Sequence, residues 1–122
     1  MARLKEDPVR EKRIIYEIVV DAYGEEERAM GWYYYAENEM QFPFRARCHA
    51  ADESSPLRKG EEVEVVGLPS EQTCLSELRV RVRWQGRTMA VPLSQLKALD
   101  ADEKTDEVIE GWHYWTRRGY RF

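Results

Sequence analysis

Carboxylate side chains are concentrated in one stretch of the chain, between Glu17 and Glu39. Seven acidic residues face a single cation, Arg28, in this stretch (Glu17, Asp21, Glu25, Glu26, Glu27, Glu37 and Glu39). Glu17 and Asp21 are four residues apart, so a helix would place them together. Like charges at this spacing destabilise a helix by about 0.2–0.5 kcal/mol per pair. A bound cation would reverse that cost, and hard cations such as Ca²⁺ bind several oxygen ligands at once.

Further oxygen donors follow in the tripeptide Glu37-Asn38-Glu39. We expect these residues in a turn after an aromatic strand, from which they could bring carboxylate and amide oxygens to the same region. The residues Glu17, Asp21, Glu37, Asn38 and Glu39 are therefore the candidate metal ligands. The alternative is an ordinary solvated acidic face, which composition alone favours.

A second acidic run extends from Asp100 to Gly111, and it has the length of an EF-hand loop. The pattern fails at three positions. Lys104 stands fifth, Thr105 takes the sixth place, where the loop needs glycine, and Gly111 takes the twelfth, where it needs glutamate. A charged loop followed by the start of a helix is the favoured interpretation.

The cysteines and histidines do not have the spacing of a zinc site. Cys48 and His49 are adjacent, whereas Cys74 and His113 are far along the chain, and no CxxC or HxxxH motif occurs. The two cysteines are expected as free thiols in a reducing cytosol. Since there is also no glycine-rich phosphate loop and no G-x-S-x-G motif, we expect no enzyme.

Arginines alternate along two predicted strands, and this pattern gives an alternative function. Arg79, Arg81 and Arg83 would share one face, as would Arg45 and Arg47. Such a basic sheet face could hold an acidic protein partner or nucleic acid. Nucleic acid is the less favoured of the two, because the chain is acidic overall, with 19 basic against 23 acidic residues.

The candidate residues must be positioned by two helices and a group of short strands. An apolar stripe after Asp7 and Pro8 predicts a helix over about 8–23, and a second stripe predicts a helix over about 105–117, with Thr105 as its cap. Five strands are expected at 32–35, 40–49, 62–68, 78–84 and 88–91. The fold class is thus α+β, a small SH3-like antiparallel β-barrel over about 32–96 flanked by an N-terminal and a C-terminal helix.

Length and composition fit one domain over residues 1–122. The chain is 43% hydrophobic and 34% charged, with a net charge of −4. Residues 1–12 are polar without an apolar central region, so we expect no secretion signal. No apolar run approaches the length of a membrane-spanning helix. We therefore expect a cytoplasmic protein that does not enter the membrane.

Four segments resemble the bacterial calcium-binding proteins named after cyanobacterial CcbP. They are EIVVDAY (17–23), AMGWYYYAENEMQFPF (29–44), AVPLSQL (90–96) and WHYWTRRGY (112–120). The segment PLRKGEEVEVVG (56–67) and Cys74 also fit. The resemblance covers nearly the whole chain, and it makes the acidic-face hypothesis the favoured one.

The resemblance implies calcium ions as the cofactor and an acidic surface cluster as the site, in an intracellular buffer or sensor that could also have a protein partner. Carried over to this chain, it again indicates Glu17, Asp21, Glu37, Asn38 and Glu39 as ligands. The family pattern tends to have aspartate where this chain has Asn38. Asparagine offers one neutral oxygen, so calcium binding should be weaker here.

Overall fold

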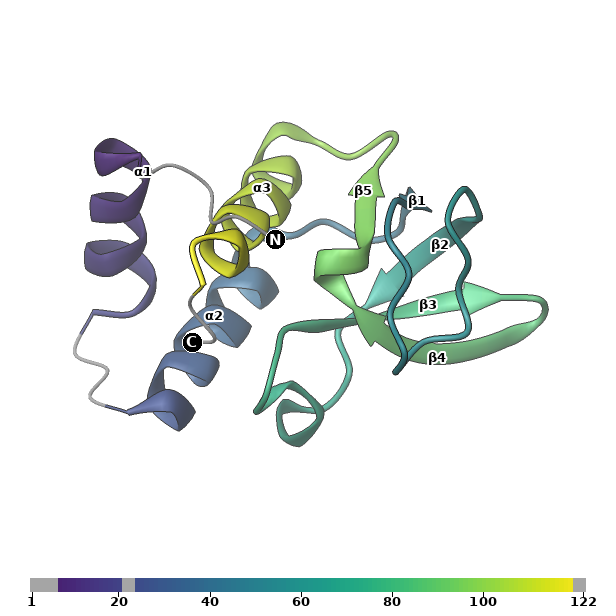
Figure 1. The fold of residues 1–122 in the computed structure, drawn as a ribbon, viewed down its shortest axis with the longest axis horizontal. Coiled ribbons are helices and arrows are strands. Elements are labelled where there is room, and N and C mark those ends of the chain that lie inside the picture. Colours follow the sequence, from purple (N-terminus) through teal and green to yellow (C-terminus); the bar gives the residue numbers. More distant parts are fainter. Residues whose placement is uncertain (1–6, 21–23, 120–122) are drawn as a thin grey trace.

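A computed structural model describes residues 7–20 and 24–119. Figure 1 shows the helices on one side of the molecule and the sheet on the other. The helices and short helical turns are α1 (Pro8–Arg13), η1 (Ile14–Ile18), α2 (Glu25–Glu39), η2 (Glu71–Cys74), η3 (Leu93–Gln95) and α3 (Glu103–Arg117). The strands are β1 (Phe44–Cys48), β2 (Glu62–Gly67), β3 (Arg79–Trp84), β4 (Arg87–Pro92) and β5 (Leu96–Ala98).

The first helix begins where the sequence predicts. The Asp7 side chain accepts a hydrogen bond from the backbone N–H of Arg10 at 3.1 Å, and Pro8 occupies the first turn. The helix continues from α1 into η1, a π-helical turn, and ends at Ile18. Val19 and Val20 lie outside it, so its end falls short of the predicted residue 23 within the described chain.

The predicted strand at 32–35 is wrong, because these residues lie in the middle of α2. Ala29, Trp32, Tyr33 and Ala36 are buried at helical spacing along one side of α2. Trp32 packs edge-on against Trp112 of α3, with 5.1 Å between the ring centroids. Burial of this ring between two helices outweighs the strand preference of an aromatic run.

The five strands form one antiparallel sheet in the order β4-β3-β2-β1-β5. Alternate residues of β1 and β3 are buried, as the sequence pattern predicts. Strands β4 and β5 are the two edges, and the described residues form no ladder between them. The sheet is therefore open and covers 44–98, rather than a closed barrel over 32–96, and its fifth strand is β5 instead of an aromatic strand.

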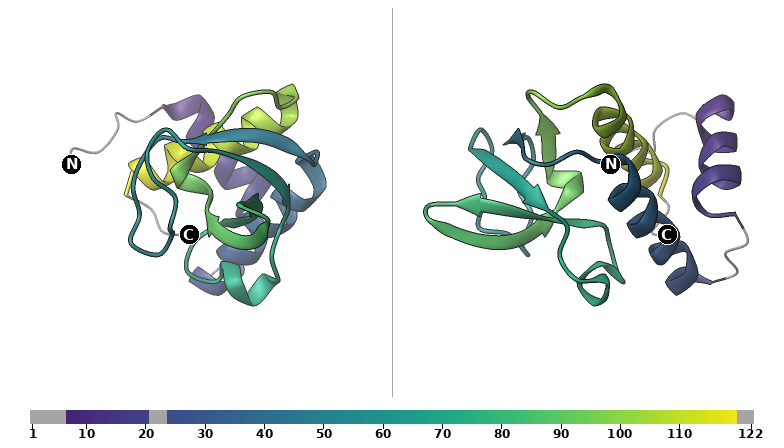
Figure 2. Two further views of the ribbon diagram at one scale, coloured as in Figure 1. Left: turned by 90° about the vertical axis from the view of Figure 1, so that its right-hand side faces the viewer. Right: turned by 180° about the vertical axis from the view of Figure 1, so that it is seen from behind.

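The helix α3 starts two residues earlier than predicted, and Asp102 rather than Thr105 is its cap residue. Thr105 is fully buried, donates a hydrogen bond to the Asp102 side chain and accepts one from the backbone N–H of Gln41 at 2.8 Å. This hydroxyl fixes the start of α3 against the segment that leads into β1. Figure 2 shows α2 and α3 packed beside each other next to the sheet, with α1 outermost.

Within the described part of the chain, no helix has both the length and the apolar character needed to cross a membrane.

Candidate functional site

The tripeptide Glu37-Asn38-Glu39 forms the last turn of α2, not a turn after a strand. Successive residues of a helix point about 100° apart, so the two glutamates point to different sides of α2. Glu39 faces α1 and α3, whereas Glu37 lies on the side of η2. The predicted ligands are thereby divided into two groups.

The first group is a hollow of about 520 Å³ between α1, α2 and α3. Glu17, Glu39 and Glu107 line it together with Arg13, Lys104 and Tyr35. The structure brings two of the predicted ligands, Glu17 and Glu39, to the same hollow, together with Glu107 from the second acidic run.

The carboxylates of this first group already form ion pairs with the basic side chains of Arg13 and Lys104. Arg13 donates from Nε to Glu17 at 2.8 Å and from Nη2 to the Tyr35 hydroxyl at 2.7 Å, and it also pairs with Glu107. Burial lowers the pKa of Arg13, but Tyr35, Glu17 and Glu107 together raise it above its ordinary value. Lys104 Nζ lies 3.9 Å from a Glu39 oxygen. An incoming metal ion would have to displace these side chains.

The second group lies where the end of α2 meets η2. The Tyr34 hydroxyl donates to Glu71 Oε1 at 2.8 Å, and the Tyr33 hydroxyl donates to the Pro69 carbonyl at 2.6 Å. The hydrogen bond to Glu71 is the main cause of the raised pKa of Tyr34, and the charge of Glu37 adds to it. Thus Glu37 and Glu71 both lie near Tyr34.

No arginine or lysine of the described segments forms an ion pair with Glu37 or Glu71. Glu37, Asn38 and Glu71 are exposed. Their carboxylate and amide oxygens are the donor type that Ca²⁺ prefers. The second group therefore offers accessible oxygen donors that form no ion pair with the described arginines and lysines, although Arg81 lies near enough for its charge to act on Tyr33.

These donors fit calcium in kind, but they are not arranged as a finished cage. In the segments 7–20 and 24–119, no three His, Cys, Asp or Glu side chains converge closely enough to hold a metal ion. Calcium takes about six to eight oxygen ligands. Water, backbone carbonyls and rotated side chains would have to complete its coordination. Asp21, the remaining predicted ligand, lies outside the described residues.

Comparison with known proteins identifies the family. The chain matches the calcium-binding CcbP family over residues 12–116. It belongs to that family of calcium-binding proteins. The crystal structure of Anabaena CcbP is similar over 100% of both chains, with 40% identity and a TM-score of 0.86. A structure described as a calcium-binding protein in its calcium-binding form matches over 100% of both chains, with 40% identity and a TM-score of 0.84. No curated protein is significantly similar in sequence.

The sequence predicts that the second acidic run of this CcbP-family chain is a charged loop followed by the start of a helix, and the structure agrees. Most of it is helix, because α3 begins at Glu103. Asp100 Oδ1 accepts from the backbone N–H of Arg45 at 2.6 Å, and the hydrogen bond from Thr105 lowers the pKa of Asp102. These two carboxylates serve backbone and cap positions at the start of the helix.

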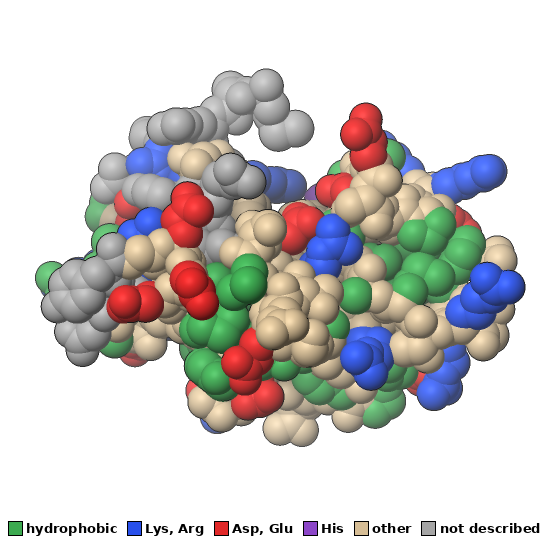
Figure 3. Space-filling view, turned by 90° about the horizontal axis from the view of Figure 1, so that it is seen from below, with side chains coloured by type: hydrophobic (Ala, Val, Ile, Leu, Met, Phe, Trp, Pro, Cys, Tyr) green, Lys and Arg blue, Asp and Glu red, His purple; other side chains and the backbone are tan. Residues whose placement is uncertain are grey.

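The basic sheet face of the CcbP-family chain is largely neutralised by its own glutamates. Arg45 and Arg47 both pair with Glu62, and Arg83 Nη1 pairs with Glu64 at 3.0 Å. The antiparallel register sets these charges opposite each other across β1, β2 and β3. Seen from below, basic side chains lie mainly over the sheet half of the molecule and acidic ones mainly over the helical half (Figure 3).

Glu71 is the candidate residue that sequence reasoning missed. It lies in the stretch 69–73, which has no periodic pattern and falls between the strands predicted at 62–68 and 78–84. Its position near Glu37 depends on the packing of η2 against the end of α2. No local signal in the sequence could have indicated that contact.

Proposed function

We propose that this chain is a cytoplasmic calcium buffer or sensor without catalytic activity, and that Ca²⁺ first contacts Glu37, Asn38 and Glu71 where α2 meets η2. The observation that carries this proposal is the pair of glutamates near Tyr34, both exposed and without a described cation partner. Like charges close together raise the free energy of the empty protein, and a divalent ion relieves that repulsion.

Glu17, Asp21 and Glu39 complete the acidic surface cluster proposed from the sequence. Glu17 and Glu39 lie in the first group, where a calcium ion would compete with Arg13 and Lys104 for the same carboxylates. We therefore propose this group as the weaker of two calcium sites. Binding there would loosen the contacts that hold α1 to α3.

Calcium calorimetry on matched variants tests the assignment. Glu37→Gln and Glu39→Gln remove the same charge from the same helical turn. We expect Glu37→Gln and Glu71→Gln to weaken binding by roughly tenfold or more, since even an outer partner of a metal ligand is worth that much. Glu39→Gln should have a smaller effect.

Two outcomes contradict the assignment. Equal losses in Glu37→Gln and Glu39→Gln would mean that only the overall charge matters. A loss confined to Glu39→Gln would move the site to the first group, and a loss in Asp21→Asn would add Asp21 to the ligands.

The alternative function, an adaptor that holds an acidic partner on its basic sheet face, would use a smaller surface than the sequence indicates. Arg81 and Arg87 are exposed and form no ion pair with described residues. They are the arginines left to hold an acidic protein partner. The affinity for such a partner would fall steeply as the salt concentration rises. Calcium binding is recognised by a different test, because oxygen ligands at a calcium site would prefer calcium over magnesium at the same salt concentration.

A further inference from the structure

A cavity of about 460 Å³ lies between α3 and the adjoining ends of β1 and β5, and Glu37, Asn38 and Glu71 are not among the residues that line it. Two histidines line it, His49 from the residue after β1 and His113 from α3. Their ring centroids are 5.2 Å apart and their planes are tilted by 57°. Two imidazoles bound to one metal ion stand about this far apart, because each metal–nitrogen bond is about 2.0–2.1 Å long.

Backbone carbonyls fix the orientation of both rings. His49 Nε2 lies 2.9 Å from the Ser94 oxygen and His113 Nε2 lies 3.3 Å from the Leu93 oxygen. A carbonyl can only accept, so Nε2 carries the proton in both rings and Nδ1 keeps a lone pair. Ligating histidines in proteins are commonly held in this way, with the other ring nitrogen donating to a carbonyl.

The burial of His113 favours the neutral form that a metal ion needs. Burial is the main cause that lowers the pKa of His113 to about 4, and the neighbouring His49 and Arg117 lower it further. A neutral imidazole at pH 7 can bind a metal ion without first losing a proton.

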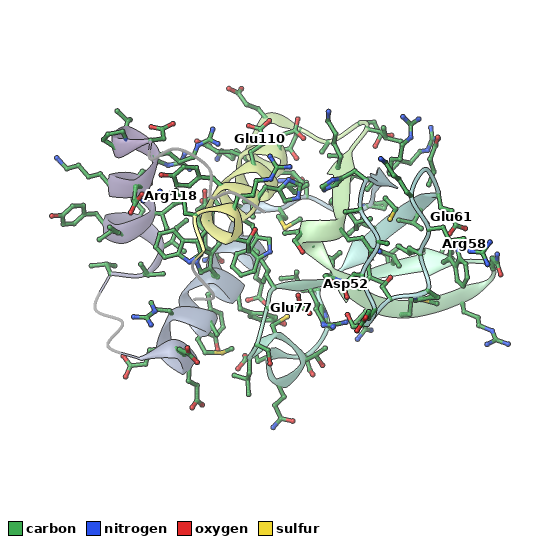
Figure 4. All side chains as sticks on the ribbon, in the orientation of Figure 1. Asp52, Arg58, Glu61, Glu77, Glu110 and Arg118 are labelled. Carbon is green, nitrogen blue, oxygen red and sulfur yellow. The ribbon has the colours of Figure 1, made fainter. Side chains whose placement is uncertain are left out.

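Glu110 can supply an oxygen ligand to the same cavity. It precedes His113 by three residues on α3, so both side chains project from neighbouring positions of the helix. Glu110 lies at the outer edge of α3 (Figure 4), its side chain is 66% exposed, and its ion pair with Arg10 is long, at 3.8 Å. In this structure the carboxylate does not converge with the two rings, since no three such side chains of the described residues are close enough to hold a metal ion. The exposed side chain has room to rotate toward the rings, and the site forms only when it does.

The charges around the cavity balance. Asp106 and Glu110 contribute two negative charges, and Lys97 and Arg117 contribute two positive ones, so the formal sum is zero at neutral pH. The cavity thus does not repel a cation by net charge. Both thiols are engaged elsewhere, since Cys48 Sγ lies 3.1 Å from the Ala50 oxygen and Cys74 Sγ contacts Arg79.

We propose that this cavity binds a divalent transition-metal ion of the zinc type through His49, His113 and the rotated carboxylate of Glu110, with water at the remaining position. Imidazole nitrogen suits zinc, nickel and copper, whereas calcium prefers oxygen. The two kinds of ion would thus occupy different sites. The site differs from the cysteine and histidine combination that the sequence disfavours, because only the two histidines come together.

Zinc calorimetry in the presence of saturating calcium tests the proposal, with cobalt absorption as a report on the ligand type. We expect one zinc ion per chain. Binding should be lost in His49→Gln and weakened by roughly tenfold or more in Glu110→Gln. Asp106→Asn is the matched control, because it removes a carboxylate from the same cavity, and it should bind zinc almost as the native chain does.

His49→Gln and His113→Gln should leave calcium affinity unchanged, so the zinc test and the calcium assignment can fail separately. Zinc binding that persists in both histidine variants, or disappears only when Cys48 and Cys74 become serine, would overturn the proposal. So would the absence of zinc binding in a native chain that binds calcium. His113 is partly buried, so His113→Gln could lose zinc because it destabilises the fold. His49→Gln is therefore the decisive variant, and an unchanged melting temperature shows that its loss of zinc binding is not a loss of the fold.

Discussion

A Cβ atom added to Gly31 would lie 2.4 Å from the carbonyl oxygen of Ile18. Helix α2 and the end of η1 therefore touch backbone to backbone at this point. This contact explains why a glycine stands in the interior of α2, where glycine is otherwise unfavourable. It also fixes the first helical segment, which supplies Arg13 and Glu17, against α2.

Gly31→Ala should destabilise the protein, although alanine is the better helix former by about 1 kcal/mol. The new methyl group meets backbone that cannot move aside, and overpacking of this kind costs about 1–3 kcal/mol. Gly111→Ala is the control, because its Cβ would lie 3.8 Å from Trp32 Cη2, an ordinary contact. Urea unfolding should show lower stability for Gly31→Ala and equal or higher stability for Gly111→Ala. Equal gains in both would show that the close contact does not exist.

The stability of the metal-free protein should fall in mild acid because of His113. Its pKa is about 4 in the folded chain, against about 6.5 for an exposed histidine. Between these values the unfolded chain binds a proton that the folded chain does not. Stability is therefore complete above about pH 6.5 and declines toward pH 4, by at most about 1.4 kcal/mol per pH unit from this group.

Urea unfolding of the native chain and of His113→Gln with a chelator checks this effect. The variant should have a flatter profile over the same pH range. Identical slopes would mean that His113 is protonated in the folded protein as readily as in the unfolded one.

Calcium should raise the melting temperature. Binding to the folded state alone adds about 2.7 kcal/mol at a hundredfold excess of calcium over the dissociation constant. For a domain of this size that corresponds to a shift of roughly 10 °C. Differential scanning calorimetry with calcium, and with magnesium as the control, makes the measurement. A melting temperature that does not respond to millimolar calcium would contradict the calcium proposal.

The parts of the fold with local signals could be predicted from the sequence. Asp7 and Pro8 mark the start of α1, and alternation marks β2 and β3, because caps and two-residue periodicity are properties of neighbouring residues. The aromatic run in α2 has no such signal. Its conformation depends on the packing of Trp32 against Trp112, which comes from a distant part of the chain.

The candidate sites show the same limit. Glu37 could be named as a candidate ligand because it belongs to the acidic stretch between Glu17 and Glu39. Glu71 becomes a candidate only through the hydrogen bond that it accepts from Tyr34. His49 and His113 are far apart in sequence and come together because both Nε2 atoms reach the carbonyls of η3. Contacts of this kind arise from tertiary packing, which single-sequence patterns do not contain.

Asn38→Asp should tighten calcium binding. Asn38 offers one neutral oxygen, whereas aspartate offers a charged carboxylate that can bind with both oxygens, and calcium affinity follows the number of charged ligands. Asn38 is exposed beside Glu37 on the last turn of α2, so the substitution introduces no packing change. In the empty protein the new charge adds to the repulsion with Glu37 and Glu39, which lowers stability slightly.

The variant should therefore melt at a lower temperature than the native chain with chelator and at a higher temperature with calcium. This opposite response distinguishes a metal ligand from a general effect on helix stability, which would shift both melting temperatures in the same direction. Asp substituted for exposed Gln41, just beyond α2, is a suitable control, because it adds the same charge nearby. If the calcium-dependent shift of Asn38→Asp is no larger than that of Gln41→Asp, then position 38 is not close to the ion, and Glu37 and Glu71 must bind calcium without it.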